Sequence, residues 1–211
     1  MTKYKNLLFD FDGCLVSSIE FWLNIYREAF SEFNLYPSDK EIMYHVGDWD
    51  IHKYFEIEDN QRFVDIVNSK LTDTHGRQVL SPNVVELLDE LSEQHCFAVV
   101  SSGVKSNILD ALTNNSINHH FDVVLGVHEV INIKPDSEPI LKAIDLLKGE
   151  ISNSIMIGDS RKDLEAANNA GVDSILYYPA IHENSHDLEM LLTYEPTYVV
   201  KSLLEIKEIV E

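Results

Sequence analysis

The sequence predicts an α/β fold in which a doubly wound parallel sheet carries an inserted α-helical domain. Short apolar runs recur along the C-terminal part of the 211-residue chain, and helical stretches separate them. Continuous apolar strands spaced by helices are typical of a parallel sheet covered on both faces. Residues 17–80 show helical periodicity and interrupt this alternation directly after the first strand. We therefore expect a core domain of residues 1–16 and 81–211 and an inserted helical domain of residues 17–80.

The first strand and the inserted domain have clear local signals. Residues 6–9 are apolar-rich and end at Asp10, and Asp12-Gly13 predicts a turn. Apolar residues then repeat at spacings of three and four: Phe21, Trp22, Ile25, Tyr26, Ala29 and Phe30, and later Phe63, Ile66, Val67 and Leu71. Pro37-Ser38-Asp39 predicts a helix start and Gly47-Asp48 a turn.

The second part of the chain alternates between helices and strands. Pro82 suits the first position of a helix whose buried face contains Val85, Leu87, Leu88 and Leu91. The strands expected after it cover residues 97–100, 121–125, 155–157 and 172–177, with a possible edge strand at 199–200. The helices expected between and after them cover residues 108–112, 139–147, 164–170 and 203–210.

Composition and charge restrict the class of protein. The formal net charge is -20, and a surface this acidic repels nucleic acid and anionic lipid. Cys14 and Cys96 have no spacing that suggests zinc or a redox motif, so we expect free thiols. The N-terminal apolar run is too short for a signal peptide, and no run approaches the ~18 apolar residues of a membrane span. We expect a cytoplasmic protein with no nucleic-acid or membrane partner.

Polar side chains follow three of the expected strands. Asp10 and Asp12 follow the first, Ser101 and Ser102 the second, and Asp159 a later one. Ligands bind beyond the carboxyl ends of the strands in a doubly wound sheet, so we expect these groups to meet there. A lone Asp-Gly is more often a turn or a helix cap than a site.

The gathering of several carboxylates changes that judgement. Asp10, Asp12, Asp159 and Asp163 at one sheet edge would repel one another by several kcal/mol in a protein-like dielectric, at separations of ~4 Å. A fold tolerates such a cluster when a cation lies within it, and an all-oxygen cluster suits Mg²⁺. Lys134 would supply a second positive charge, although a solvated loop lysine is an equally good interpretation from placement alone.

These groups suit phosphoryl transfer. One carboxylate would attack phosphorus and form an acyl phosphate, and a second would protonate the leaving oxygen and then activate water. Magnesium and lysine would offset the charge of the phosphoryl oxygens.

Four motifs, in this order, resemble the haloacid dehalogenase superfamily of phosphohydrolases. They are Asp10-Phe11-Asp12-Gly13 after an apolar strand, Ser101 at a strand end, Lys134-Pro135, and Gly158-Asp159-Ser160-Arg161-Lys162-Asp163. Together they extend over the whole expected core. The resemblance implies a Rossmann-like core and, for residues 17–80, the small helical cap of phosphoglycolate phosphatase and β-phosphoglucomutase types.

The resemblance also implies roles for the matched residues. Asp10 looks like the nucleophile, and Asp12 like the acid/base whose backbone carbonyl binds magnesium. Ser101 and Lys134 look like the phosphoryl-binding pair. Asp159 and Asp163 look like metal-site carboxylates beside Asp10 and Asp12. The implied activity is Mg²⁺-dependent hydrolysis of a small phosphorylated metabolite, a phosphomonoester, through an aspartyl phosphate on Asp10.

The sequence departs from the family pattern at three positions. Cys14 stands where Thr is usual, Ser17 where many capped members have Asp, and Ile133 where Gly is common. None of these departures removes a catalytic group. They weaken an assignment to one subfamily.

Three alternatives remain beside the phosphatase. A phosphomutase would share the site but transfer the phosphoryl group to a sugar hydroxyl. A non-catalytic phospho-binding protein would not need all four motif groups. A receiver-type domain has its lysine after its phosphorylated aspartate in a different strand order. Asp12 argues against a dehalogenase, because a halide leaving group needs no proton.

The inserted domain should select the substrate. Its hinges are expected near residues 16–18 and 80–82. The polar candidates for substrate contact are His45, Asp48, His52, Lys53 and Arg62. The sequence leaves their ranking, the substrate and the oligomeric state open.

Overall fold

The computed structural model describes residues 2–48, 50–71 and 79–210 of the chain. A six-stranded sheet in the order β3-β2-β1-β4-β5-β6 forms its centre, and every neighbouring pair is parallel. The strands are β1 (Asn6–Phe9), β2 (Cys96–Val100), β3 (Phe121–Leu125), β4 (Ser154–Gly158), β5 (Asp173–Tyr177) and β6 (Tyr198–Val200). The predicted doubly wound parallel sheet is confirmed.

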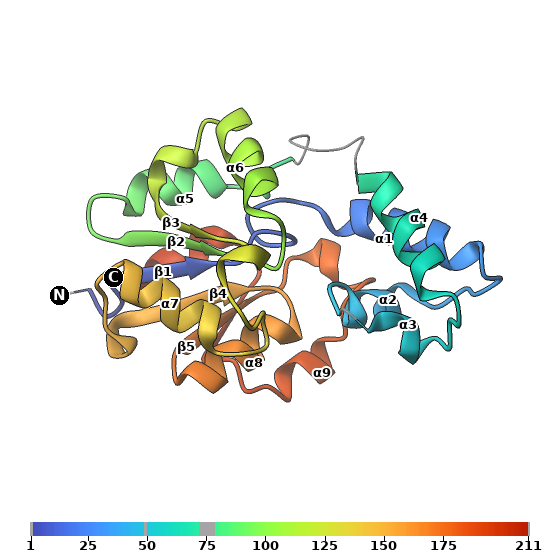
Figure 1. Ribbon diagram of the computed structural model, residues 1–211. Helices are drawn as coiled ribbons and strands as arrows, with labels where there is room; N and C mark the ends of the chain where they lie inside the picture. The colour runs from blue at the N-terminus through green and yellow to red at the C-terminus, as the bar shows by residue number, and fades with distance from the viewer. Residues whose placement is uncertain (1, 49, 72–78, 211) are drawn as a thin grey trace.

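Helices cover both faces of this sheet, which explains why its strands are continuously apolar. One face packs against α5 (Val84–Leu91), α6 (Lys105–Asn114) and α10 (Ile206–Val210). The opposite face packs against α7 (Glu138–Leu146) and α8 (Arg161–Ala170). The short helix α9 (Leu188–Leu192) packs beside α8 and β5. Figure 1 shows the two layers on either side of the strands.

The core also contains, among its described residues, five short 3-10 turns. They are η1 (Asn118–His120), η2 (Val127–Glu129), η3 (Ile151–Asn153), η4 (Ala180–His182) and η5 (Leu203–Glu205). Of these, η4 follows β5 directly and bears on the site below.

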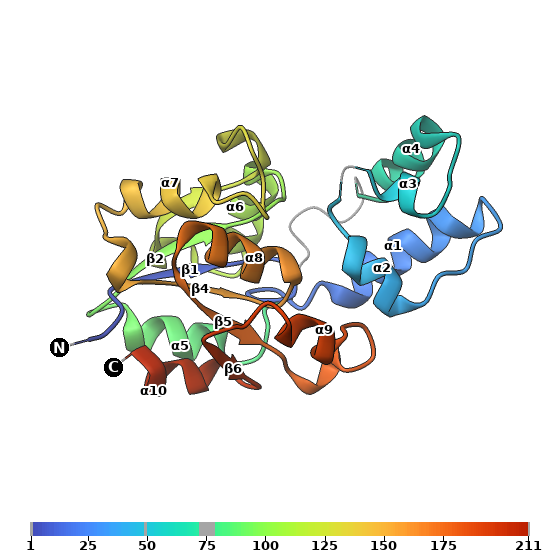
Figure 2. The same ribbon diagram turned by 90° about the horizontal axis from the view of Figure 1, so that it is seen from below.

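Within the described residues between β1 and α5, four helices lie together beyond one end of the sheet, opposite the chain termini (Figure 2). They are α1 (Ile19–Ser31), α2 (Asp39–His45), α3 (Ile51–Tyr54) and α4 (Asn60–Leu71). Their apolar faces form a separate core that includes Tyr26, Phe30 and Phe63. We call these four helices the helical segment. Its packing suits the expected inserted domain of residues 17–80, whose boundaries stay a prediction and whose residues 72–78 lie outside the described part.

Two chain connections link the helical segment to the sheet side by side. Val16 and Leu80 form an antiparallel bridge, and the Ser17 amide donates to the Val79 carbonyl at 2.8 Å. The expected hinge regions therefore pair with each other next to the end of β1. Whether they act as hinges remains a prediction.

One expected helix start is wrong. Helix α5 begins at Val84, because Asn83 before it has a left-handed backbone with φ of 68° and Pro82 lies outside the helix. The same shift places Val84 on the buried face and leaves Val85 44% exposed. The other expected strands and helices agree with the structure to within a few residues. No helix of the described residues has the length and apolar character needed to cross a membrane.

Candidate active site

The site lies where the order of the strands reverses. β1 has β2 on one side and β4 on the other, so the chain leaves the sheet in opposite directions from these central strands. This is the position at which doubly wound sheets bind ligands. Asp10 follows β1, Ser101 follows β2 and Asp159 follows β4, so three short sequence motifs meet at one edge.

Lys134 joins two of the candidate carboxylates. Its ammonium donates to Asp10 Oδ1 and to Asp163 Oδ1, both at 2.6 Å, and to the Val100 carbonyl at 2.9 Å. Burial alone would lower the pKa of Lys134, but the Asp10 and Asp163 carboxylates outweigh it and raise that pKa. The lysine is therefore a fixed positive charge beside the Asp10 oxygen.

Asp10 itself is held in a strongly negative setting. Burial and the nearby Asp163 carboxylate raise the pKa of Asp10 well above its usual range, and Lys134 opposes this only in part. A nucleophilic carboxylate must be ionised, so the site as built favours a further positive charge close to Asp10.

Asp12 has different surroundings from Asp10. Its Oδ1 accepts a hydrogen bond at 2.9 Å from the indole of Trp22, which lies on α1. Burial raises the pKa of Asp12, and the Trp22 and Ser18 hydrogen bonds oppose that rise. A carboxyl group whose pKa is raised keeps its proton to higher pH, as a general acid requires.

Gly13 leaves room for the Asp159 carboxylate to lie against the turn after β1. Its backbone has φ of +79°, and an added Cβ would lie 2.2 Å from Asp159 Oδ2. A residue without a side chain is thus required both by the backbone and by the carboxylate.

A cavity of about 150 Å³ connects the remaining groups. The Ser101 oxygen accepts a hydrogen bond from the Gly103 amide at 3.0 Å, which leaves its hydroxyl proton available to a ligand. The walls combine residues of the sheet edge with residues of the helical segment. The polar lining comprises Asp10, Asp12, Ser101, Ser102, Lys134, Asp159, Ser160 and Lys162, and Trp22, Tyr26 and Met43 close the opposite side.

The carboxylates fit a magnesium ion by their chemistry. Oxygens of Asp10, Asp159 and Asp163 lie within 4.8 Å of one another, and all three residues are buried. Lys134 is the one ammonium that bonds to any of them among the described residues. Asp163 also caps the start of α8, where its Oδ2 accepts a hydrogen bond from the hydroxyl of Ser160 at 2.6 Å. Oxygen donors with excess negative charge are what Mg²⁺ prefers.

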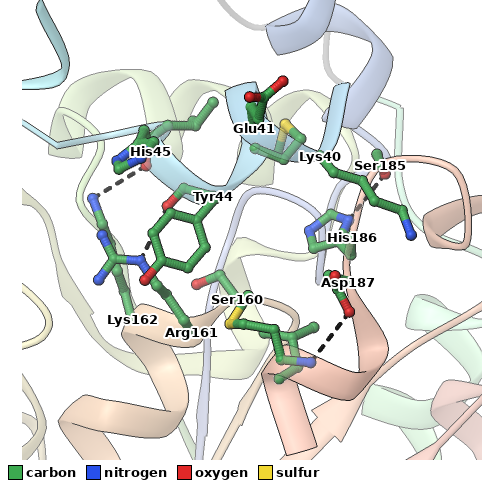
Figure 3. A pocket seen from close by; sticks show the side chains of 14 residues that line it. Lys40, Glu41, Tyr44, His45, Ser160, Arg161, Lys162, Ser185, His186 and Asp187 are labelled. Carbon is green, nitrogen blue, oxygen red and sulfur yellow. Dashed lines mark hydrogen bonds between the residues drawn. The ribbon is translucent and has the colours of Figure 1, made fainter. Parts of the chain in front are cut away.

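Partly buried ion pairs connect the helical segment to α8. Asp48 lies 2.8 Å from Lys162 Nζ and 2.8 Å from an Arg161 nitrogen, and it also contacts His45 at 3.0 Å. The Arg161 guanidinium also donates to the Tyr44 carbonyl at 3.0 Å. We call Asp48, Arg161 and Lys162 the Asp48 junction. Figure 3 shows Arg161 and Lys162 beside Tyr44 and His45.

The five polar candidates of the helical segment therefore lie in different environments. His45 lines a second cavity of about 240 Å³, and Asp48 belongs to the junction. His52 is half-buried. Lys53 is exposed and pairs with Asp50, and Arg62 is exposed and pairs with Glu32. Lys53 and Arg62 thus lie in surface ion pairs, and neither lines the Asp10 cavity.

Three residues near the site were missed by the sequence analysis. Lys162 lies inside the fourth motif, and its place between two fixed positions was the available signal. His182 and His186 lie beside Asp159, and both rings are buried. Burial lowers the pKa of His182 to about 4, so that ring is neutral at pH 7. Their spacing of four residues was a signal, but nothing in the sequence connects it with the end of β4.

Comparison with known proteins finds a matching family and relatives along nearly the whole chain. The sequence profile of the family described as haloacid dehalogenase-like hydrolase matches residues 7–177. The pyrophosphatase PpaX of Halalkalibacterium halodurans is 26% identical, and the alignment covers 99% of this chain and 97% of that protein. The PpaX of Oceanobacillus iheyensis is 23% identical over 98% and 96% of the two chains.

Solved structures show the same fold. A haloacid dehalogenase-like protein from Streptococcus pneumoniae superposes with a TM-score of 0.82 at 23% identity and covers 98% of each chain. A hydrolase from Pseudomonas syringae gives a TM-score of 0.81 at 20% identity, over 98% of this chain and all of its own.

Proposed function

Since the chain belongs to the haloacid dehalogenase-like hydrolase family, we propose that it is a Mg²⁺-dependent phosphatase that hydrolyses a small phosphorylated metabolite through an aspartyl phosphate on Asp10. The observation that carries the proposal is the meeting of Asp10, Asp12, Ser101 and Lys134 in one cavity. A cytoplasmic location stays a prediction of the sequence.

The residues divide the reaction between them. The Asp10 carboxylate attacks phosphorus while the Asp12 carboxyl gives its proton to the leaving oxygen. Asp12, now ionised, takes a proton from the water that attacks phosphorus of the aspartyl phosphate, which releases phosphate and restores Asp10. Lys134 and the Ser101 hydroxyl bind phosphoryl oxygens throughout. Asp10, the Asp12 carbonyl, Asp159 and Asp163 would hold magnesium, which supplies further positive charge to the phosphoryl group.

A direct test is to trap and locate the phosphoenzyme. With Mg²⁺ and a metal fluoride that mimics the phosphoryl group, the wild-type protein should form a stable complex, whereas Asp10→Asn should form none. Asp110→Asn is the control, because that aspartate is exposed on α6 and remote from the cavity. A complex that forms equally well with Asp10→Asn would contradict the assignment of the nucleophile.

Product analysis with a phosphorylated substrate and Mg²⁺ separates the alternatives from one another. Release of inorganic phosphate into water identifies a phosphatase. Transfer of the phosphoryl group from Asp10 to a sugar hydroxyl identifies a phosphomutase. Binding of a phosphorylated compound with neither outcome identifies a non-catalytic protein.

Inorganic pyrophosphate is a specific second candidate for the substrate. Lys162 lines the Asp10 cavity, and its ammonium, which pairs with Asp48 at 2.8 Å, is a second cation beside Lys134. A diphosphate has a second charged phosphoryl group that this ammonium could contact, and the PpaX relatives are named pyrophosphatases. A neutral leaving group would not need the Lys162 ammonium.

The substrate test compares two specificity constants. Lys162→Met should lower kcat/KM for pyrophosphate by ~10–100-fold more than kcat/KM for an aryl phosphate, as expected for a lost charged hydrogen bond. Lys53→Met is the matched control, because that lysine is exposed and lies outside the cavity. An equal loss for both substrates would mean that Lys162 only supports the fold.

A further inference from the structure

His182 and His186 form a buried cluster with Asp159 that the proposed reaction does not use. His182 ends η4 after β5, and His186 lies four residues further on, before α9. Their side chains are 3% and 5% exposed, and that of Asp159 is 3% exposed. The two imidazole rings stack with centroids 4.6 Å apart and planes 20° apart.

The three side chains direct one atom each toward the others. His186 Nε2 lies 3.2 Å from Asp159 Oδ2, and His182 Nδ1 lies 4.0 Å from the same oxygen. All three atoms lie within 4.8 Å of one another. Separations of this size are suitable for three ligands of one metal ion at bond lengths of ~2.0–2.2 Å.

The neighbouring hydrogen bonds suit metal binding by His186. The Ser185 hydroxyl donates to the His182 carbonyl at 3.3 Å, and its oxygen lies 2.9 Å from His186 Nδ1, from which it can accept. In the neutral imidazole with Nδ1 protonated, Nε2 would present its lone pair to a metal ion beside Asp159. Figure 3 shows the Ser185–His186 contact.

The ring of His182 lies beside the same carboxylate. Its Nδ1, which faces Asp159, has no hydrogen-bond partner within the described structure, and neither has Nε2 of His186. Two buried ring nitrogens without hydrogen-bond partners therefore face a carboxylate, and a cation bound between them would satisfy all three groups.

We propose that Asp159, His182 and His186 bind a first-row transition-metal ion such as Zn²⁺, at a site that adjoins the Asp10 cavity through the shared Asp159. Two imidazoles and one carboxylate suit such ions, whereas Mg²⁺ prefers oxygen ligands alone. Metal-binding histidines commonly donate their second N–H to a protein oxygen, and Ser185 offers such an oxygen to Nδ1 of His186.

An entry path and a structural consequence support the assignment. His186, Ser185 and Ser160 line the second cavity of about 240 Å³, which gives an ion and its water a route to the cluster. An ion held there would fix the loop between β5 and α9 against the end of β4. This would also fix one oxygen of Asp159.

The test is a titration of the metal-free whole protein with Zn²⁺ while excess Mg²⁺ occupies the oxygen site. Calorimetry should show one Zn²⁺ per chain. His182→Gln and His186→Gln should each weaken binding by at least ~100-fold, because loss of an outer-shell partner alone costs ~10–100-fold. His128→Gln is the control, since that histidine is exposed. No Zn²⁺ binding, or binding that both variants retain, would overturn the proposal.

A second measurement uses the wild-type fold only. Nitrogen NMR of the imidazoles should show protonated Nδ1 in metal-free His186 and large shifts of His186 Nε2 and His182 Nδ1 on adding Zn²⁺. Protonated Nε2 in metal-free His186, or resonances that do not move, would overturn it. Both readouts measure binding, so they are independent of whether the protein proves to be a phosphatase.

Discussion

Asp10 and Asp12 lie two residues apart, yet their contacts give them different chemistry. Asp10 touches the Lys134 ammonium, and Asp12 accepts from the Trp22 indole. The sequence could predict that both reach the same sheet edge, because that follows from the strand and the turn. It could not predict the Trp22 contact, because this depends on how α1 packs against the turn.

Asp12 supports a prediction about turnover. Asp12→Asn should slow hydrolysis of an aryl phosphate by ~10²–10⁴-fold, the usual contribution of a general acid or base. Burial raises the pKa of Asp12, so the wild-type rate should stay high above the ordinary carboxyl range and fall as pH rises through that pKa. The pH profile of kcat checks this. Asp110→Asn should keep the wild-type profile, and an unchanged rate in Asp12→Asn would exclude Asp12 as the acid.

Gly13 supports a prediction with a close internal control. Gly13→Ala and Gly171→Ala both put a side chain on a left-handed backbone, with φ of +79° and +69°, at a cost of about 1–2 kcal/mol. Only at Gly13 does the new Cβ meet Asp159, since nothing lies within 4 Å at Gly171. Both variants should lose stability in denaturant unfolding, but only Gly13→Ala should lose most of its activity. Full activity in Gly13→Ala would mean that Asp159 can move without consequence.

At the scale of helices and strands, periodicity explains what the sequence could predict. The strands β1 to β5 each contain an apolar run, although β3 includes Asp122 and β5 begins with Asp173. The longer helices repeat every three to four residues, so both kinds of element were predictable. The four-residue α3 and five-residue α9 are too short to show a period. His182 and His186 lie in η4 and in the loop before α9, which show no period either, so the cluster beside Asp159 was missed.

The Asp48 junction is a contact between elements that no local pattern indicates. Asp48 was named as a candidate for substrate contact, but it pairs with Arg161 and Lys162 on α8 instead. Burial alone would raise the pKa of Asp48, but Lys162, His45 and Arg161 outweigh it and lower that pKa. The ion pairs therefore stabilise the junction wherever Asp48 is ionised.

This contact gives a pH-dependent prediction. Asp48→Asn should lower the free energy of unfolding by about 2–3 kcal/mol at neutral pH, because two cations lose a largely buried partner. A lowered carboxyl pKa stabilises the fold above the unfolded value of about 3.8 and loses its effect as pH falls through the folded value. The difference between wild type and variant should thus be constant near pH 7 and shrink below about pH 4. Asp50→Asn, from an exposed pair with Lys53, should change stability little. A difference that does not depend on pH would exclude the ion pairs as its cause.

At the scale of the whole molecule, the charge of the chain and the charge of the site act together. The formal net charge is -20, and the site adds buried carboxylates around Lys134. An acidic protein that acts on an anion needs concentrated positive charge at the point of binding. Magnesium at the Asp10 cluster would supply part of it.

Magnesium should therefore affect both stability and rate. Adding Mg²⁺ at ~100 times its dissociation constant to the chelated protein should stabilise it by ~2.7 kcal/mol, or a rise in Tm of roughly 5–10 °C. Phosphate release should fall to the uncatalysed level on chelation and return with Mg²⁺. Asp159→Asn should lose most of the thermal shift, whereas Asp110→Asn should keep it. Equal melting temperatures and rates with and without Mg²⁺ would contradict the magnesium site.

The hydrogen bond from Trp22 to Asp12 allows the site to be followed by tryptophan fluorescence. The chain has two tryptophans, Trp22 and Trp49, so Trp49→Phe leaves a single tryptophan, whose indole N–H donates to the proposed acid. Indole emission responds to charge and hydrogen bonding at this nitrogen. The fluorescence of that variant would report in real time each change in the protonation of Asp12 and each movement of α1 away from the turn after β1.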